Sequence, residues 1–178
     1  MTRVCERRLI HKGAKFDFET VSFEGADGRI VRREVVRHPG AVTVLPVLDD
    51  GAGVVLIRNE RFTLGTELWE LPAGTLEAGE DPAACALREL EEEAGYQANA
   101  AEALGRFYTT PGMTDELMHA FVATGLTKTE QRLEQDERIR VETMPVQEAL
   151  RMVDRGDMMD AKSMLTLLMA SRRGLLGG

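Results

Sequence analysis

Apolar and polar residues alternate over the first forty positions in the manner of β-strands. Residues 16–23, FDFETVSF, alternate with one change of phase, which is typical of a half-buried strand. Asp27 and Gly28 then give a hairpin signal, and residues 30–38 return as the partner strand. A Pro-Gly pair ends this pattern. Residues 1–39 are therefore predicted to form an antiparallel β-meander.

Longer apolar segments follow this break. Residues 41–50 form a nearly continuous apolar strand, as expected for a strand that is buried within a sheet. Pro46 removes one backbone donor from it, which indicates an edge or a bulge at that point. A turn at Asp50-Gly51 leads into the next strand. Further strands are predicted at residues 53–62, at the start of residues 67–80, and at residues 103–110, 117–126 and 138–144.

The first of three predicted helices has clear signals at both ends. Asp81 is suited to be the N-cap, Pro82 to be the first helical residue, and Gly95 to lie just past the end. The helix is therefore predicted over residues 82–94. Its apolar residues recur at three- and four-residue spacing, at Ala83, Leu87, Leu90 and Ala94.

Two more helices are predicted toward the C-terminus. One begins at Pro145 and is stopped by Gly156, and the other covers residues 159–172. Strands mixed with a few helices in this order predict an α+β fold, with helices packed on a mixed β-sheet, over residues 40–178. The apolar face of the last helix is expected to consist of Met164, Leu165, Leu168 and Met169.

Composition and charge narrow the classes of function. The chain has 178 residues, enough for one domain with a small appendage, and its 43% hydrophobic and 29% charged residues are typical of a globular protein. A net charge of −8 argues against a general nucleic-acid binder, which needs a basic stripe to displace counterions. An acidic protein that handles an anionic small molecule needs local arginine or lysine, or a metal ion, at its site.

Cysteine use and hydropathy indicate the compartment. Cys5 and Cys85 are too few for a disulfide framework and belong to no zinc-binding spacing. The N-terminus lacks the continuous apolar segment of a signal peptide, and no apolar run approaches the roughly 18–20 residues that span a bilayer. We therefore expect reduced thiols in a soluble, cytoplasmic protein without a membrane partner.

The first predicted helix carries a concentrated acidic cluster. Glu89, Glu92 and Glu93 project from one face of it, whereas Glu91 points elsewhere. Carboxylates at this spacing repel each other by roughly 0.2–0.5 kcal/mol per pair, and Arg88 is the only basic residue of this helix. Magnesium takes carboxylate oxygens from a rigid element, so a bound cation would stabilise the cluster. Spacing alone leaves a second interpretation open, an exposed acidic face without a role.

The acidic cluster is part of a longer pattern. From residue 74 the chain fits G-x₅-E-x₇-R-E-U-x-E-E-x-G-U, where U is a bulky apolar residue. This pattern resembles the signature of the Nudix hydrolases, which cleave nucleoside diphosphates linked to another moiety. The resemblance implies a Nudix-type α/β/α sandwich. The matching residues are Gly74, Glu80, Arg88, Glu89, Leu90, Glu92, Glu93, Gly95 and Tyr96.

The resemblance implies a set of metal ligands. Glu89 and Glu93 would bind Mg²⁺, or Mn²⁺ as the alternative, and Glu92 would assist directly or through water. The carbonyl group of Ala73, just ahead of the pattern, matches the backbone ligand of the family.

The segments on both sides of the pattern resemble one subgroup, the ADP-ribose pyrophosphatases. The similar segments are residues 33–47 and residues 67–74, ELWELPAG, together with Pro111, sixteen residues beyond the last glycine of the pattern. In this subgroup the N-terminal meander is exchanged between the subunits of a dimer and helps to cover the adenine. The resemblance therefore implies a homodimer.

The same resemblance implies contacts with the substrate. Arg58 and Arg61 stand where the subgroup has basic residues near the active site, and the alternative is that both are ordinary surface arginines. Glu116, Pro111 and Met113 belong to the segment that is expected to contact the substrate.

A further glutamate is implied in the loop before the strand at residues 138–144, where it would act as a base or a metal ligand. Glu137 is the best positional match because it is nearest to that strand, and Glu134 is the second choice. Arg88 would orient the site through an ion pair with Glu80.

The implied reaction is the Mg²⁺-dependent hydrolysis of the pyrophosphate bond of ADP-ribose, which gives AMP and ribose 5-phosphate. One alternative is another nucleotide sugar, such as GDP-mannose or ADP-glucose, as the small-molecule substrate. An alternative of another class is a non-catalytic Nudix domain that senses nucleotides. The intact set of glutamates favours the enzyme.

Overall fold

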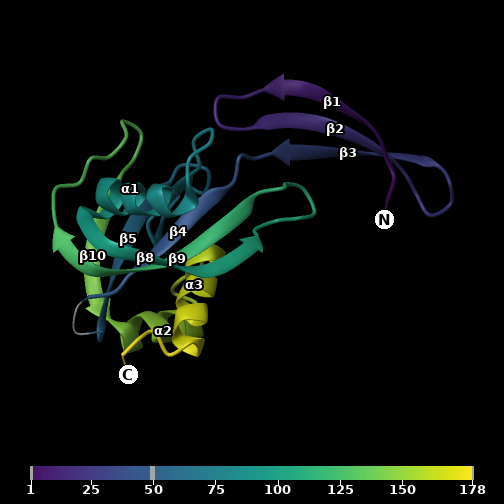
Figure 1. Ribbon diagram of the computed structural model, residues 1–178. Helices are drawn as coiled ribbons and strands as arrows, with labels where there is room; N and C mark the ends of the chain where they lie inside the picture. The colour runs from purple at the N-terminus through teal and green to yellow at the C-terminus, as the bar shows by residue number, and fades with distance from the viewer. Residues whose placement is uncertain (1, 49–50, 178) are drawn as a thin grey trace.

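The computed structural model describes residues 2–48 and 51–177, and its main body holds a layer of β-sheet between helices (Figure 1). Helix α1 (Pro82–Ala94) lies on one side of this layer. Helices α2 (Val146–Arg155) and α3 (Ala161–Arg172) lie on the other side. The predicted packing of helices on a mixed sheet is confirmed. None of the described helices is long and apolar enough to cross a membrane.

The strands of the described residues are β1 (Val4–Lys12), β2 (Asp17–Glu24), β3 (Ile30–Arg37), β4 (Ala41–Pro46), β5 (Gly53–Arg61), β6 (Thr66–Glu70), β7 (Ala73–Thr75), β8 (Tyr96–Tyr108), β9 (Leu117–Lys128) and β10 (Ile139–Pro145). They form three sheets. Two are antiparallel, with the orders β1-β2-β3 and β10-β5-β6. The third has the order β7-β4-β9-β8 and is mixed, because β4 and β9 run parallel.

The N-terminal sheet projects away from the main body (Figure 1). The hairpin predicted at Asp27 and Gly28 is present: Gly28 has a φ of 76°, and a backbone hydrogen bond of 3.0 Å closes the turn. Strand β1 was not predicted as a separate strand, because its sequence VCERRLIHK shows no regular alternation. The half-buried strand predicted at residues 16–23 is observed as β2, in which Val21 and Ser22 are buried. Phe16 and Phe18, at its start, are exposed.

Pro46 does not mark an edge strand, because β4 lies between β7 and β9. The N–H of Val44 donates to Pro72 on the β7 side, at 3.0 Å. The N–H of Val47 donates to Ala123 on the β9 side, at 2.9 Å. The nitrogen of Pro46 therefore faces the β7 side, beyond the last residue that pairs with β7. The missing donor is tolerated because pairing has ended on that side of an internal strand.

Part of the sequence prediction lies outside the described residues. The apolar segment expected at residues 41–50 is observed as β4, but its last two positions are not described. The turn expected at Asp50-Gly51 starts at one of these positions.

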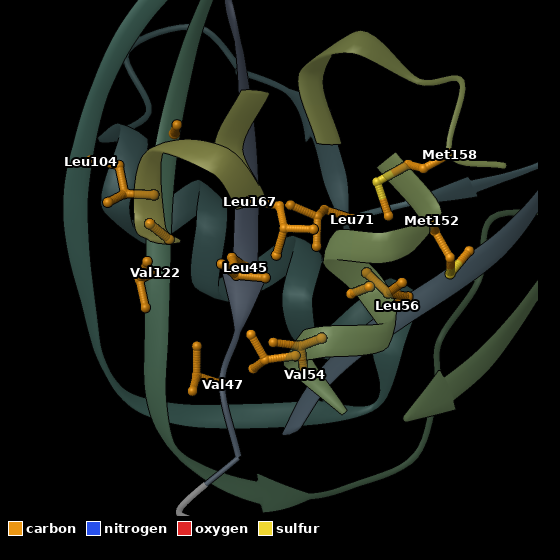
Figure 2. Packing of buried hydrophobic residues seen from close by; sticks show 14 residues of the cluster. Leu45, Val47, Val54, Leu56, Leu71, Leu104, Val122, Met152, Met158 and Leu167 are labelled. Atoms are coloured by element: carbon orange, nitrogen blue, oxygen red, sulfur yellow. The ribbon is translucent and has the colours of Figure 1, made fainter. Parts of the chain in front are cut away.

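The two faces of the sheet layer carry separate apolar clusters. Alternate residues of β5 pack toward α1 on one face and toward α2 and α3 on the other. Burying a valine or leucine side chain contributes roughly 1.5–3 kcal/mol, so this layer firmly fixes the strands around the site. Figure 2 shows the cluster on the side of α2 and α3, which includes Leu45, Leu56, Leu71 and Leu167.

Helix α1 has the predicted boundaries. The side chain of Asp81 accepts hydrogen bonds from two backbone N–H groups at 3.0 and 3.1 Å, and Gly95 ends the helix with a φ of 66°. The predicted apolar stripe is only partly correct, since Ala83 and Leu87 are half-buried. Two carboxylates lie on the buried face instead. The buried residues are Cys85, Ala86, Glu89, Leu90, Glu93 and Ala94.

The apolar face predicted for the last helix is only partly correct. Met164 and Met169 pack against the core, but Leu165 and Leu168 are exposed. The buried residues of α3 are Ser163, Thr166, Leu167 and Ala170. The physical reason is a polar contact with the sheet layer. The hydroxyl of Ser163 accepts a hydrogen bond from the N–H of Leu71 at 2.7 Å, which turns this side of α3 inward.

Candidate active site

A cavity of about 670 Å³ lies where α1, β7, the end of β5 and the loop before β10 meet. This volume falls in the range of small-molecule sites, roughly 300–1,000 Å³. Glu89 and Glu93 of α1 line the cavity beside Ala73 and Gly74 of β7. Glu137 reaches it from the loop before β10. Residues that are far apart in the sequence therefore place three carboxylates around one space.

The carboxylate of Glu89 packs against the backbone of Gly74. Glu89 is only 8% exposed, and a Cβ atom at position 74 would lie 1.8 Å from its Oε1 atom. Glycine is therefore required at position 74 if Glu89 keeps this place. Burial raises the pKa of Glu89, Arg88 opposes that shift, and the charges of Glu92 and Glu137 add to it.

Glu93 is more deeply buried, at 4% exposure. Its Oε2 atom accepts a hydrogen bond from the N–H of Ala73 at 2.7 Å. Burial nevertheless raises the pKa of Glu93 to about 8, and the charges of Glu89 and Glu137 contribute to the increase. A carboxylate in this position is unfavourable in its charged form unless a positive charge joins it.

Arg88 holds the acidic cluster to the neighbouring loop. Its Nε and Nη2 atoms donate to Glu80 at 2.9 and 3.1 Å. Its Nη1 atom donates to Glu89 at 2.8 Å and to Glu92 at 2.9 Å. The bonds from Arg88 lower the pKa of Glu80 to about 2, and they raise the pKa of Arg88 itself. The predicted ion pair between Arg88 and Glu80 is confirmed.

The donors at the cavity suit a hard divalent cation. Glu89 and Glu93 supply two buried carboxylates beside the backbone of Ala73, and magnesium and manganese prefer oxygen donors. Among the described residues, however, no group of three or more acidic, histidine or cysteine side chains is arranged to hold a metal ion. One reason is Glu92, which pairs with Arg88 and does not line the cavity. The fitting donor set is therefore the pair of buried glutamates with a backbone carbonyl.

The loop before β10 brings both predicted glutamates to the cavity. Glu137 lies near enough to the two buried carboxylates for its charge to raise their pKa values. Its own carboxylate accepts a hydrogen bond from the N–H of Glu134 at 2.8 Å. The side chain of Glu134 is 65% exposed and lies 3.6 Å from Lys15 of the N-terminal sheet region. Of the two, Glu137 faces the buried carboxylates.

The two predicted arginines lie on opposite faces of β5. Arg61 lines the cavity, and its Nε and Nη2 atoms donate to Glu70 at 2.7 and 2.5 Å. Arg58 lies 4.7 Å from the ring centroid of Trp69 and donates to Glu67 at 2.9 Å, on the side of α2. Strand residues three apart face opposite sides, so Arg58 lies outside the cavity that Arg61 lines.

The segment between β8 and β9 is only partly at the site. Glu116 lines a second cavity of about 480 Å³, which shares Arg61 with the first. Pro111 and Met113 are exposed and line neither of these two cavities. The carbonyl of Met113 instead accepts a hydrogen bond from the N–H of Val36 at 2.9 Å, so this segment meets β3.

Two charged residues beside the site were not predicted from the sequence. Glu70 is 1% exposed and binds both Arg61 and Lys162. A glutamate within the apolar strand segment ELWEL was a usable signal for Glu70. Lys162 lies 92 residues further along the chain, and no local pattern connects the two.

The fold and the site together define a class of protein. Two helix layers enclose a sheet layer, and a capped helix presents buried carboxylates to a small-molecule cavity. These features are typical of an enzyme that uses a divalent cation. The NUDIX domain family model matches residues 37–167. The chain belongs to the Nudix hydrolase family, as the sequence pattern predicted.

Similar proteins extend over most of the chain. An ADP-ribose pyrophosphatase of Bacillus subtilis is 42% identical over 163 residues, which cover 90% of this chain and 88% of that protein. A methanol dehydrogenase activator of Bacillus methanolicus is 38% identical, and the aligned region covers 93% of this chain and 90% of that protein. A GDP-mannose pyrophosphatase of Cronobacter sakazakii is 37% identical, with 84% of each chain covered.

A solved structure shows the same fold. The crystal structure of an ADP compounds hydrolase superimposes with a TM-score of 0.80. The superposition covers 96% of this chain and 92% of the chain in that structure. Its sequence is 23% identical, so the likeness concerns the fold alone. The predicted Nudix-type α/β/α sandwich is confirmed.

Proposed function

We propose that the chain hydrolyses the pyrophosphate bond of ADP-ribose and releases AMP and ribose 5-phosphate. The observation that carries the proposal is the buried pair Glu89 and Glu93 beside the backbone of Ala73, in a cavity of about 670 Å³. The choice of ADP-ribose is supported by the similarity to the ADP-ribose pyrophosphatase of Bacillus subtilis over 90% of this chain.

Nudix hydrolases use a divalent cation, and we propose Mg²⁺, with Mn²⁺ as the alternative. Glu89, Glu93 and the carbonyl group of Ala73 would hold it. The proposed assistance by Glu92 requires its carboxylate to leave Arg88. When bound, such a cation neutralises the diphosphate and acts on it as a Lewis acid.

The chain's own residues supply the remaining functions in this proposal. Glu137 removes a proton from the attacking water, which typically contributes roughly 10²–10⁴-fold to the rate. Water attacks one phosphorus in line, a new P–O bond forms, and the bridging P–O bond breaks. Arg61 binds phosphate oxygens, Glu116 contacts the terminal ribose, and Arg88 orients the glutamates of the helix.

The substrate can be tested with a panel of nucleotide sugars at a fixed Mg²⁺ concentration. We expect kcat/KM for ADP-ribose to exceed that for GDP-mannose and ADP-glucose by about tenfold or more, measured as phosphate that a phosphatase then releases from the products. Glu93→Gln is the control for contaminating activity. An advantage of GDP-mannose over ADP-ribose of the same size would contradict the choice of substrate.

A regulatory role is the second candidate. The observation in its favour is the 38% identity with a protein named methanol dehydrogenase activator. The complete set of glutamates on α1 favours catalysis, because a domain that only senses nucleotides has no need of buried, mutually repelling carboxylates. Absence of turnover with every member of the panel would favour the regulatory candidate.

We also propose that the chain forms a homodimer through residues 1–39, treated as a unit beside residues 40–178. The N-terminal sheet exposes an unusual number of apolar side chains, which mark an interaction surface. Residues 1–39 hold nine Lys and Arg against six Asp and Glu, whereas the remainder holds thirteen against twenty-four. A second copy therefore offers a surface of opposite charge. The exposed apolar residues are Val4, Leu9, Ile10, Phe16, Phe18 and Ile30.

Ile10→Glu is expected to convert the dimer into a monomer, because it places a charge in the proposed apolar contact. Sedimentation velocity at micromolar concentrations measures this change. Leu168→Glu is the matched control, since Leu168 is an exposed apolar residue on α3. A wild-type protein that sediments as a monomer would contradict the proposed dimer.

A further inference from the structure

A group of charged side chains lies where the two cavities meet: Arg61 lines both, and Glu70, Asp160 and Lys162 line the second. Glu70, at the end of β6, is 1% exposed, and the side chain of Lys162 on α3 is 11% exposed. Lys162 donates to Glu70 and to Asp160, each at 2.7 Å. Arg61 donates to Glu70 through two nitrogen atoms at 2.7 and 2.5 Å. The group thus joins the end of β5, the end of β6 and the start of α3.

The bidentate bond fixes one edge of the guanidinium group of Arg61. A planar guanidinium that is held by Nε and Nη2 has a single orientation about its bonds to the carboxylate. Among the described residues, no protein group bonds to the Nη1 atom of Arg61. Arg61 lines both cavities, and its side chain is 41% exposed. The free edge is therefore available to an anion in the cavity.

Lys162 makes this arrangement possible. Arg61 and Lys162 share the carboxylate of Glu70, and Lys162 also pairs with Asp160, so the two cations balance the two carboxylates and Arg61 keeps its fixed orientation. The start of α3 also binds the segment after β6, which leads to the proposed metal ligands. The hydroxyl of Ser163 accepts a hydrogen bond from the N–H of Leu71, next to Glu70 in the chain.

We infer that Glu70 and Lys162 are positioning residues of the reaction: they hold Arg61 so that its free edge binds the phosphate oxygens of the substrate. The inference rests on the proposed function, since the anion is taken to be the diphosphate of a nucleotide sugar. Glu70 and Lys162 line only the second of the two cavities, whereas Arg61 lines both. Both act through Arg61.

A double-mutant cycle on kcat/KM tests the inference. Glu70→Gln is expected to lower kcat/KM for ADP-ribose by roughly 10–100-fold, the usual effect of removing a partner that orients a functional group. In an Arg61→Ala background the same change is expected to have an effect of less than about twofold, because the residue through which it acts is gone. Additive losses in the two backgrounds would overturn the inference.

Two further variants separate positioning from folding. Glu70→Gln removes one negative charge, and combining it with Lys162→Met removes one positive charge and restores the balance. The folding of the single and the double variant is checked by thermal unfolding. The double variant is expected to fold and still to show the loss. Glu67→Gln is the matched control, because Glu67 accepts from Arg58 on the opposite face of the same two strands. It is expected to leave kcat/KM unchanged, and an equal loss would contradict the inference.

A spectroscopic measurement makes the test independent of turnover. The Nε–H signal of Arg61, assigned by its disappearance in Arg61→Lys, is expected to exchange slowly with solvent in the wild type and rapidly in Glu70→Gln. If the wild type fails to hydrolyse ADP-ribose, the proposed function fails and this signal alone decides whether Glu70 positions Arg61. Rapid exchange of the signal in the wild type would overturn the positioning role.

Discussion

Glu93→Gln is expected to lower kcat by several orders of magnitude while it stabilises the metal-free protein at alkaline pH. The loss of turnover follows from the loss of one of two buried carboxylates that would hold the cation. The gain in stability follows because a neutral amide avoids burying a charge and removes the repulsion from Glu89 and Glu137. Gln can still accept the hydrogen bond that Ala73 donates at 2.7 Å. Steady-state kinetics and thermal unfolding in a chelator measure the two effects.

The pH dependence of the stability follows from the pKa of Glu93, which burial and neighbouring charges raise from 4.5 to about 8 in the folded protein. The folded state therefore binds a proton that the unfolded state has released. The stability from this group is complete below pH 4.5 and is lost as the pH rises through about 8, at about 1.4 kcal/mol per unit of pKa shift. Metal-free Glu93→Gln should equal the wild type at pH 4.5 and exceed it in melting temperature at pH 9.

Glu91→Gln is the matched control for this prediction. Glu91 lies on the same helix but pairs with Arg132 at 3.1 Å, away from the cavity. It is expected to change neither turnover nor the pH dependence of unfolding. If metal-free Glu93→Gln melted at a lower temperature than the wild type at pH 9, the charged form of Glu93 would not be unfavourable in the folded protein, and the account would be contradicted.

Glu137→Gln is expected to reduce kcat by roughly 10²–10⁴-fold, the usual contribution of a general base. Glu134→Gln is expected to have less than a tenth of that effect, because its side chain is 65% exposed and lies 3.6 Å from Lys15. The reason for the difference is position. Glu137 lies near enough to Glu89 and Glu93 to raise their pKa values.

Turnover of the two loop variants is compared at saturating ADP-ribose and Mg²⁺, and the pH profile of kcat provides the second readout. Removal of the base should abolish the acidic limb of that profile in Glu137→Gln and leave it in Glu134→Gln. The reverse order of the two losses would transfer the role of base to Glu134.

Local chemistry made helix α1 predictable. The cap at Asp81 and the left-handed Gly95 depend on residues next to one another, so they can be deduced from a short window. The buried face of α3 could be predicted only in part in this way, because Met164 and Met169 do pack against the core. Apolar spacing favoured Leu165 and Leu168, but the hydrogen bond between Ser163 and Leu71 turned the polar side inward.

The site likewise contains residues that a local pattern predicts and residues that it does not. The pattern on α1 located Glu89 and Glu93, and the strand alternation that separates Arg58 from Arg61 was present in the sequence. Contacts over long sequence distances were not accessible. The bond between Glu70 and Lys162 joins residues 92 positions apart, and only the folded chain brings them together.

Titration calorimetry with Mg²⁺ tests most directly whether Glu89 and Glu93 form a cation site. The account predicts saturable binding at up to millimolar concentrations by the wild type and by Glu91→Gln, and loss of that binding in Glu93→Gln. A wild-type protein that takes up no divalent cation at these concentrations, with or without nucleotide, would contradict it.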